Sequence, residues 1–198
     1  MSGYDAAAAI FAGGAATRYG GRQKALIEVA GETILSRQLR VVRPLVREIV
    51  VVAGAKNSSE LEGRGARVIM DRWPGAGPLA GLDAALAAIR APRVLALACD
   101  MPAVQPAVVE SLLSRAKTAE ADVVIPEVGG RLQPLLAVYS ARVAPLAETR
   151  LAAGELRMVA LPDAARRAGL TVVRIGEREL ARADPDLRSF ANLNSPPN

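Results

Sequence analysis

The chain has 198 residues, of which 51% are hydrophobic and 3% aromatic, and its formal net charge is +5. That length is enough for an α/β domain with a buried core, and the hydrophobic content excludes intrinsic disorder. The positive charge comes from scattered arginines, and aromatic side chains are too few for a base-stacking surface. We therefore expect no nucleic-acid partner.

Cysteine and histidine usage narrows the chemistry further. Cys99 is the only cysteine, which excludes an intramolecular disulfide and suits a reducing, cytoplasmic location. Histidine is absent, which excludes histidine-based acid–base catalysis and histidine metal ligands. The sequence shows neither a secretory signal nor an apolar run long enough to span a bilayer, so we expect no membrane association.

Hydrophobic patterning predicts strands and helices that alternate along the chain. Short, nearly continuous apolar runs are typical of buried strands, and the amphipathic segments between them are typical of helices. The predicted strands cover residues 6–12, 48–53, 66–70, 93–99, 122–126, 135–139 and 170–175. The predicted helices cover residues 32–42, 79–89, 104–117, 142–151 and 156–168. This order predicts a three-layer, Rossmann-like α/β fold with a mostly parallel central sheet, in a single domain spanning residues 1–198.

A glycine-rich stretch, 10–24, follows the first predicted strand and reads Ile-Phe-Ala-Gly-Gly-Ala-Ala-Thr-Arg-Tyr-Gly-Gly-Arg-Gln-Lys. Gly13 and Gly14 have no Cβ, so their backbone N–H groups can approach an anion closely. Arg18 and Lys24 add positive charge, and the pattern favours a chain of phosphates. The spacing matches neither the P-loop nor the dinucleotide fingerprint. From spacing alone, an ordinary glycine-rich turn is the alternative.

Asp100 directly follows the predicted strand 93–99, and Pro102 closes that strand. A carboxylate at the end of a buried strand, beside a phosphate loop, suits Mg²⁺, which takes oxygen ligands and shares substrate phosphates. The alternative role is a cap for the helix predicted to begin at residue 104.

Asp71 ends another predicted strand and precedes the segment 77–81, Gly-Pro-Leu-Ala-Gly. The two glycines of this segment flank a predicted helix N-terminus, where free N–H groups can contact a nucleotide. Because ligands bind beyond the carboxyl ends of parallel strands, we expect the glycine loop, Asp71 and Asp100 to meet at one edge. The alternative for Asp71 is a turn residue that satisfies its own backbone.

Asn192 and Asn194 stand on alternate residues near the end of the sequence. In an extended segment, alternate side chains face the same way, so the two amides could hydrogen-bond a polar heterocycle or a phosphate. A polar terminus without such a role is the alternative.

Together these segments resemble the molybdenum cofactor guanylyltransferases, a family of nucleotidyltransferases. The resemblance rests on Phe-Ala-Gly-Gly-x-x-x-Arg-Tyr-Gly-Gly-x-x-Lys, Cys-Asp-Met-Pro at Asp100, Gly-Pro-Leu-x-Gly after Asp71, and the near-terminal Asn-x-Asn-Ser-Pro. Three positions depart from the family pattern: Phe11 replaces a usual leucine, Gln23 an acidic residue and Ala55 an asparagine.

The resemblance implies a nucleotidyltransferase fold and the transfer of GMP from GTP to the terminal phosphate of molybdenum-bearing molybdopterin, with release of pyrophosphate. It implies Mg²⁺ as the cofactor, bound by Asp100, and charge stabilisation by Arg18 and Lys24. The resemblance also implies that Asn192 and Asn194 contact the pterin. It is compatible with other molybdenum cofactor proteins as partners. The nucleotide-binding residues that it implies are Phe11, Ala12, Gly13, Gly14, Gly21, Lys24, Asp71 and Asp100.

The implied reaction agrees with the composition, because a phosphate acceptor is already ionised near neutral pH and needs no histidine base. Guanine rather than cytosine follows from the resemblance alone. The related cytidylyltransferases tend to have Ala-Gly at Gly13-Gly14 and to lack the Gly-Pro-Leu-x-Gly segment. A cytidylyltransferase, another nucleotide-dependent transferase that activates a phosphate, and a non-catalytic nucleotide-binding module are the alternatives.

Overall fold

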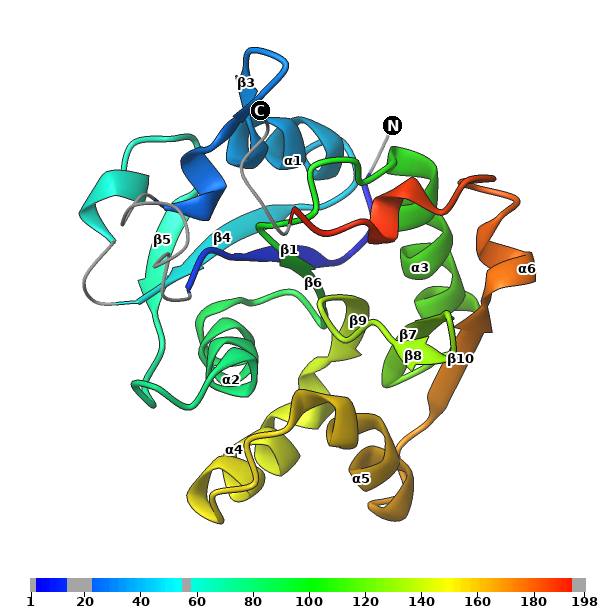
Figure 1. Ribbon diagram of the computed structural model, residues 1–198. Helices are drawn as coiled ribbons and strands as arrows, with labels where there is room; N and C mark the ends of the chain where they lie inside the picture. Colours follow the sequence, from blue (N-terminus) through cyan, green and yellow to red (C-terminus); the bar gives the residue numbers. More distant parts are fainter. Residues whose placement is uncertain (1–2, 14–22, 55–57, 194–198) are drawn as a thin grey trace.

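The computed structural model describes residues 3–13, 23–54 and 58–193, and within them eight strands form one central sheet (Figure 1). The strands are β1 (Ala7–Phe11), β4 (Glu48–Ala53), β5 (Arg67–Met70), β6 (Arg93–Ala98), β7 (Val123–Val128), β8 (Arg131–Leu132), β9 (Leu136–Ser140) and β10 (Val172–Gly176). Their order is β10-β7-β9-β6-β1-β4-β5, and β8 pairs with β7. β1 therefore lies inside the sheet, between β6 and β4, and the glycine-rich stretch follows its carboxyl end.

Strand directions confirm the predicted mostly parallel sheet. β1 runs parallel to β4 and β6, β4 to β5, and β7 to β10. β9 is reversed and pairs antiparallel with both β6 and β7, while β8 forms an antiparallel hairpin with β7. The apolar run predicted the strand β9 but not its direction. Only residues 129–135 separate β7 from β9, so the chain turns back and the two neighbours run antiparallel.

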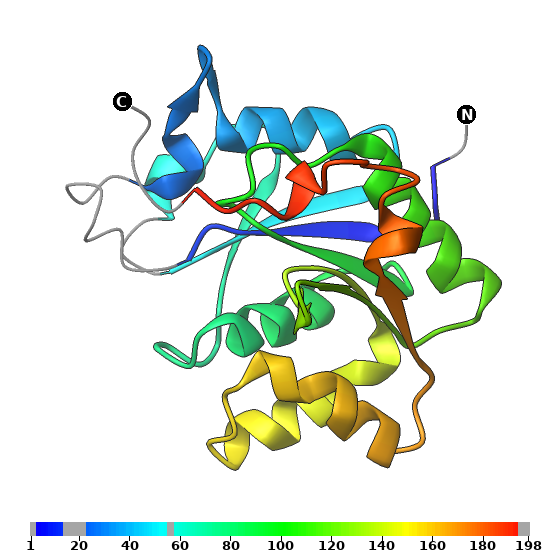
Figure 2. The ribbon, with the colours of Figure 1, turned by 45° about the vertical axis from the view of Figure 1, so that its right-hand side comes forward.

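Helices cover both faces of the sheet, so the predicted three-layer arrangement is confirmed (Figure 2). One face carries α1 (Ile34–Val42) and α3 (Pro106–Thr118), and the other carries α2 (Pro78–Ala88), α4 (Ala144–Ala152) and α5 (Leu161–Arg167). The short α6 (Glu177–Leu180) follows β10. In the described part of the chain, no helix has both the length and the apolar character needed to cross a bilayer.

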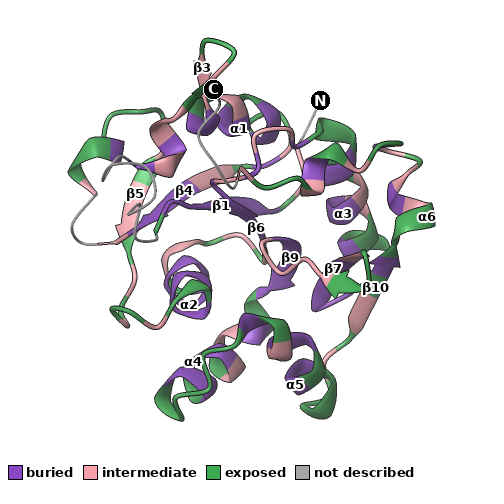
Figure 3. Cartoon of the chain, in the orientation of Figure 1, coloured by how far each residue is buried: buried purple, intermediate pink, exposed green. Residues whose placement is uncertain are grey.

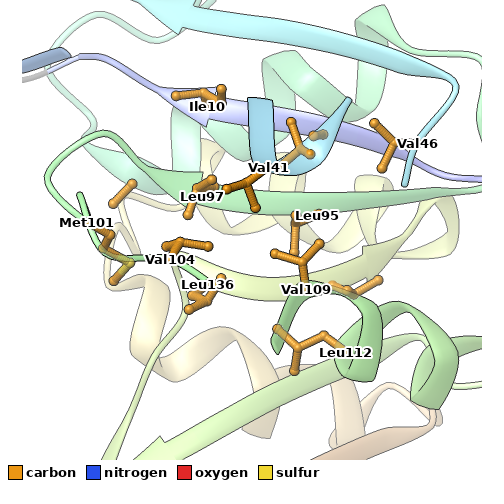
Figure 4. Packing of buried hydrophobic residues seen from close by; sticks show 14 of the residues in the cluster. Ile10, Val41, Val46, Leu95, Leu97, Met101, Val104, Val109, Leu112 and Leu136 are labelled. Atoms are coloured by element: carbon orange, nitrogen blue, oxygen red, sulfur yellow. The ribbon is translucent and has the colours of Figure 1, made fainter. Parts of the chain in front are cut away.

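β1 shows why its sequence is apolar throughout. Each of its residues is at most 6% exposed, because helices pack on both faces (Figure 3). Ala8 and Ile10 belong to the core under α1 and α3, which also contains Val41 (Figure 4). Ala9 and Phe11 belong to the core on the opposite face, under α2. A strand that is buried on both faces cannot alternate between polar and apolar residues.

One helix begins later than predicted. The expected helix 32–42 starts at Ile34, because β3 (Glu32–Thr33) pairs antiparallel with β2 (Glu28–Val29). The Thr33 hydroxyl oxygen then accepts a 3.2 Å hydrogen bond from a backbone N–H in the first turn of α1. Because a threonine in this position satisfies an otherwise unpaired helix donor, it marks the start of the helix.

Prolines mark where other helices begin. First-turn prolines occur at Pro78, Pro106, Pro145 and Pro162. At this position the missing N–H has no partner to lose. The segment predicted as 104–117 accordingly begins at its proline, and the segments 142–151 and 156–168 each start with a 3-10 turn before α4 and α5.

Candidate functional site

A cleft of about 740 Å³ opens at the sheet edge where β1, β4 and β6 end. Its lining includes these predicted site residues: Phe11, Ala12, Gly13, Lys24, Asp71 and Asp100. The segments that follow separate parallel strands therefore meet at one edge, as expected. Four other predicted residues lie outside the described residues, namely Gly14, Arg18, Gly21 and Asn194.

The end of β1 is hydrogen-bonded to both neighbouring strands. The Ala12 N–H donates to the Val52 carbonyl oxygen at 2.8 Å, and the Cys99 N–H donates to the Phe11 carbonyl oxygen at 3.1 Å. A Cβ on Gly13 would meet only an ordinary contact of 3.7 Å among the described residues. Among the described residues, packing therefore does not demand glycine at this position.

Asp100 lies two residues beyond β6, and its carboxylate is partly open to solvent. Its side chain is 26% exposed, and Oδ2 lies 3.8 Å from Lys24 Nζ. The following helix, α3, begins at Pro106, and its N-cap position is held by Gln105 rather than Asp100. The alternative role of Asp100 as the cap of that helix is therefore excluded. The carboxylate instead faces a cation within the lining of the cleft.

Cys99 also lines the cleft, although the sequence analysis assigned it no role there. Burial, followed by the nearby negative charge of Asp100, raises the pKa of the Cys99 thiol to about 12. A thiol with such a pKa stays protonated near neutral pH and is therefore a poor nucleophile and a poor metal ligand.

The loop after Asp71 forms another wall of the cleft and is held by α2. Arg72 Nη2 and Trp73 Nε1 donate to the same carboxylate oxygen of Asp83, at 2.9 and 3.2 Å. Asp83 is buried on α2, so these contacts tie the loop to the helix. Gly77, at the start of α2, has a φ of 72°, which glycine adopts without steric strain.

Gly81 has a packing role that differs from the expected one at a helix N-terminus. It lies inside α2, where an added Cβ would stand 2.7 Å from Cε1 of Phe11 and 3.2 Å from Cγ1 of Val52. Real Cβ atoms do not approach ring carbons so closely, so glycine allows α2 to pack directly on β1 and β4. Phe11, in place of the usual leucine, thereby becomes part of the cleft wall.

The carboxyl-terminal segment reaches the same edge of the sheet. The Leu193 N–H donates to the backbone carbonyl oxygen of Asp100 at 2.7 Å. Asn192 is exposed and does not belong to the cleft lining found among the described residues. The pterin contact expected of Asn192 thus stays a prediction.

Comparison with known proteins decides the family. Residues 8–168 match the family model described as the MobA-like NTP transferase domain. The chain belongs to this family. It is a nucleotidyltransferase, and the predicted enzyme class is confirmed.

Similar proteins that are named for their function agree with this family. A molybdenum cofactor guanylyltransferase of Pseudomonas putida (strain GB-1) is 36% identical, over 94% of this chain and 92% of its own. A probable molybdenum cofactor guanylyltransferase of Pelotomaculum thermopropionicum is 33% identical, over 94% and 86%. The molybdopterin-guanine dinucleotide biosynthesis protein A of Archaeoglobus fulgidus superposes with a TM-score of 0.80 at 29% identity, over 96% and 93%. These findings confirm the resemblance to molybdenum cofactor guanylyltransferases.

Besides Phe11, Gln23 is a departure from the family pattern that the structure places in the cleft of this MobA-like transferase. Its side chain is buried in the lining, and Nε2 has no hydrogen-bond partner among the described residues. A buried amide donor without an acceptor is unfavourable, and no contact within the described residues offsets the burial of this one. In the sequence, the position of Gln23 directly before Lys24 was the signal that it lies at the site. Ala55, the other departure at the nucleotide site, lies outside the described residues.

Proposed function

We propose that this MobA-like transferase transfers the guanylyl group of GTP to the terminal phosphate of the molybdenum-bearing pterin cofactor and releases pyrophosphate. The proposal is carried by the Lys24–Asp100 pair, whose charged atoms lie 3.8 Å apart inside a cleft large enough for a nucleotide. The names of the full-length relatives support the choice of GTP and the molybdenum cofactor as substrates.

The chemistry requires positioning and charge stabilisation rather than a general base. An oxygen of the acceptor phosphate attacks the α-phosphorus of GTP. The bond from that phosphorus to the bridging oxygen of the β-phosphate breaks, and pyrophosphate leaves with the bond electrons. The attacking phosphate is already ionised near neutral pH, since its second pKa is about 6. In-line alignment and stabilisation of the developing negative charge then lower the barrier.

The residues of the cleft fit Mg²⁺. Asp100 offers a partly exposed carboxylate, and the described residues contain no cluster of three or more acidic, cysteine or histidine side chains that would enclose a metal. This suits a cation that binds one or two carboxylates and takes its remaining oxygens from substrate phosphates and water. When bound, Mg²⁺ would supply positive charge to the triphosphate.

The side chains of the cleft support distinct roles in this reaction. Lys24 holds a positive charge where the leaving pyrophosphate accumulates negative charge, and Arg18 is assigned the same role. Gly13 lets the backbone approach the triphosphate, together with Gly14 and Gly21 from the same stretch. Phe11, Ala12 and Asp71 hold the nucleoside, and Asn192 and Asn194 orient the pterin. The unused donor of Gln23 supports an additional contact with an oxygen of the nucleotide.

We also propose that the chain is a single domain that works in the cytoplasm. The one sheet that runs from β1 to β10 supports the single domain. Its lone, buried cysteine suits a reducing compartment. Association with other molybdenum cofactor proteins is an expectation from the family alone.

Pyrophosphate release from each of the four nucleoside triphosphates, with Mg²⁺ and the molybdenum pterin, tests the proposal. We expect release with GTP and its loss in Asp100→Ala. Asp163→Ala is the matched control, because Asp163 is an exposed carboxylate in α5 that pairs with Arg166 and Arg174. That variant should retain wild-type turnover.

Any other result of this experiment would change a different part of the proposed function. Release with CTP and not GTP would keep the mechanism and replace the base. Release that survives in Asp100→Ala would remove Asp100 from the reaction. A folded wild-type protein that releases pyrophosphate from none of the four would leave the non-catalytic nucleotide-binding module in place.

A further inference from the structure

The turn that presents Asp100 is held by a buried side chain from α1. Gln38 is 1% exposed, and its Nε2 donates to the carbonyl oxygens of Ala98 and Met101, at 2.7 and 3.0 Å. These two carbonyls lie on either side of Asp100, one before it and one after it. A single amide group therefore bridges both ends of the segment 98–101.

The two carbonyl oxygens around Gln38 determine how its amide group is oriented. Both N–H groups are needed for the two carbonyl oxygens, which can only accept hydrogen bonds. Its Oε1 has no hydrogen-bond partner in the described part of the chain. Burying an unpaired amide oxygen is unfavourable, so the two bonds made by Nε2 must outweigh that cost.

Besides the ion pair between Lys24 and Asp100, backbone hydrogen bonds and apolar packing also restrain this turn. The Cys99 N–H donates to Phe11, and the Leu193 N–H donates to the carbonyl oxygen of Asp100. Below the turn, Met101 packs into the apolar core beside Val104 (Figure 4). Apolar packing has little directional preference, whereas the hydrogen bonds fix the orientation of the turn. Among the described residues, Gln38 is the side chain that hydrogen-bonds to the backbone of the turn on both sides of Asp100.

We propose that Gln38 is a positioning residue for Asp100, which it holds in the geometry that binds the divalent cation of the nucleotide complex. This inference rests on the proposed function, in which Asp100 is the metal ligand. Gln38 touches neither substrate nor metal and acts through the backbone of the turn. Side chains that orient a metal ligand commonly change metal affinity by about 10- to 100-fold when they are removed.

Binding of Mn²⁺ in the presence of GTP, measured by electron paramagnetic resonance without the pterin acceptor, separates positioning from general stability. Gln38→Met keeps the length of the side chain and removes both donors. We expect its Mn²⁺ affinity to fall about 10-fold, while its affinity for GTP without metal stays at the wild-type value. Gln38→Leu provides a second apolar replacement should the methionine variant not fold.

Val41→Ala is the matched control. Val41 is buried on the same helix, in the core under α1, and it makes no polar contact with the turn. This variant should lower the melting temperature without changing Mn²⁺ affinity. Equal losses of Mn²⁺ affinity in Val41→Ala and Gln38→Met would reduce Gln38 to a stabilising residue and overturn the inference.

A double-mutant cycle with Asp100→Asn distinguishes a failure of the positioning role of Gln38 from a failure of the metal-binding role of Asp100. If Gln38 acts through Asp100, then Gln38→Met should weaken Mn²⁺ binding in the wild-type background and have no further effect in Asp100→Asn. Additive losses would overturn the positioning role. Wild-type Mn²⁺ affinity in Gln38→Met, with a loss in Asp100→Asn, would overturn this inference and keep the proposed function. Wild-type affinity in Asp100→Asn would overturn both.

Discussion

Asp100 and Asp122 stand at opposite edges of the same sheet, and their surroundings differ completely. Asp122 immediately precedes β7, whereas Asp100 follows the end of the parallel strand β6. The side chain of Asp122 is 4% exposed, while that of Asp100 is 26% exposed and lines the cleft. One carboxylate belongs to the amino edge of the sheet and the other to the carboxyl edge.

Protein groups occupy the oxygens of Asp122. It accepts hydrogen bonds from the Ser140 hydroxyl at 2.8 Å, Arg142 Nη1 at 3.0 Å and the Thr171 N–H at 2.9 Å. These partners join the segments around β7, β9 and β10. Asp100, by contrast, has the cation of Lys24 at 3.8 Å, a distance that leaves its oxygens accessible to a ligand. A carboxylate saturated by its own protein stabilises the fold, and an incompletely coordinated one can bind metal and substrate.

The largest expected effect is a loss of turnover when the carboxylate at the carboxyl edge, Asp100, is removed. Asp100→Asn keeps the size of the side chain and removes its charge, so turnover should fall about 10²- to 10³-fold through lost stabilisation of the triphosphate. Stability should change little, because the side chain is partly exposed. Steady-state pyrophosphate release and thermal unfolding measure the two quantities. Turnover within twofold of wild type would contradict the assigned role.

At the amino edge we expect the opposite result, a loss of stability without a loss of turnover. Asp122→Ala leaves a guanidinium, a hydroxyl and a backbone N–H without their acceptor, so the free energy of unfolding should fall by about 3 kcal/mol. Urea unfolding measures this loss. Turnover per folded molecule should stay at the wild-type value, and a specific loss of turnover would connect this edge to catalysis.

A third variant tests whether packing shapes the cleft. Gly81→Ala introduces a Cβ 2.7 Å from the Phe11 ring, and such overpacking costs about 1–3 kcal/mol. We also expect weaker GTP binding, because Phe11 lines the cleft. Adding Phe11→Leu should restore much of the stability by giving the new methyl group room. Urea unfolding and GTP titration of the single and double variants check both effects.

The smallest expected effect concerns Tyr139, which belongs with Asp122 among the buried structural groups. Burial raises the pKa of its phenol above the ordinary value of 10.0, and its hydroxyl donates to the Pro134 carbonyl oxygen at 2.8 Å. Its stabilising contribution is therefore complete below pH 10 and is lost as the pH rises above it. Tyr139→Phe should lower the free energy of unfolding by about 1 kcal/mol at neutral pH. It should also reduce the loss of stability that occurs as the pH rises above 10. Urea unfolding at pH 7 and above pH 10 provides the test.

The elements nearest to the site could be predicted because the apolar runs are long and the residues after them are distinctive. β4 has the bounds expected from its run of β-branched residues, and the predicted strand before Asp100 ends within one residue of β6. The hairpin of β2 and β3 was missed, since its strands are two residues long and carry no apolar pattern. The direction of β9 was likewise absent from the local pattern.

The sequence by itself determined the order of the elements, the membership of the family and the types of side chain available for phosphate chemistry. These follow from local periodicity and from motifs in which neighbouring residues act together. Only the tertiary structure decided which carboxylate is saturated and which is open, that Gly81 makes room for Phe11, and that Gln38 holds the turn of Asp100. The physical reason is that these properties depend on contacts between residues far apart in the chain, which exist only once the helices pack on the sheet.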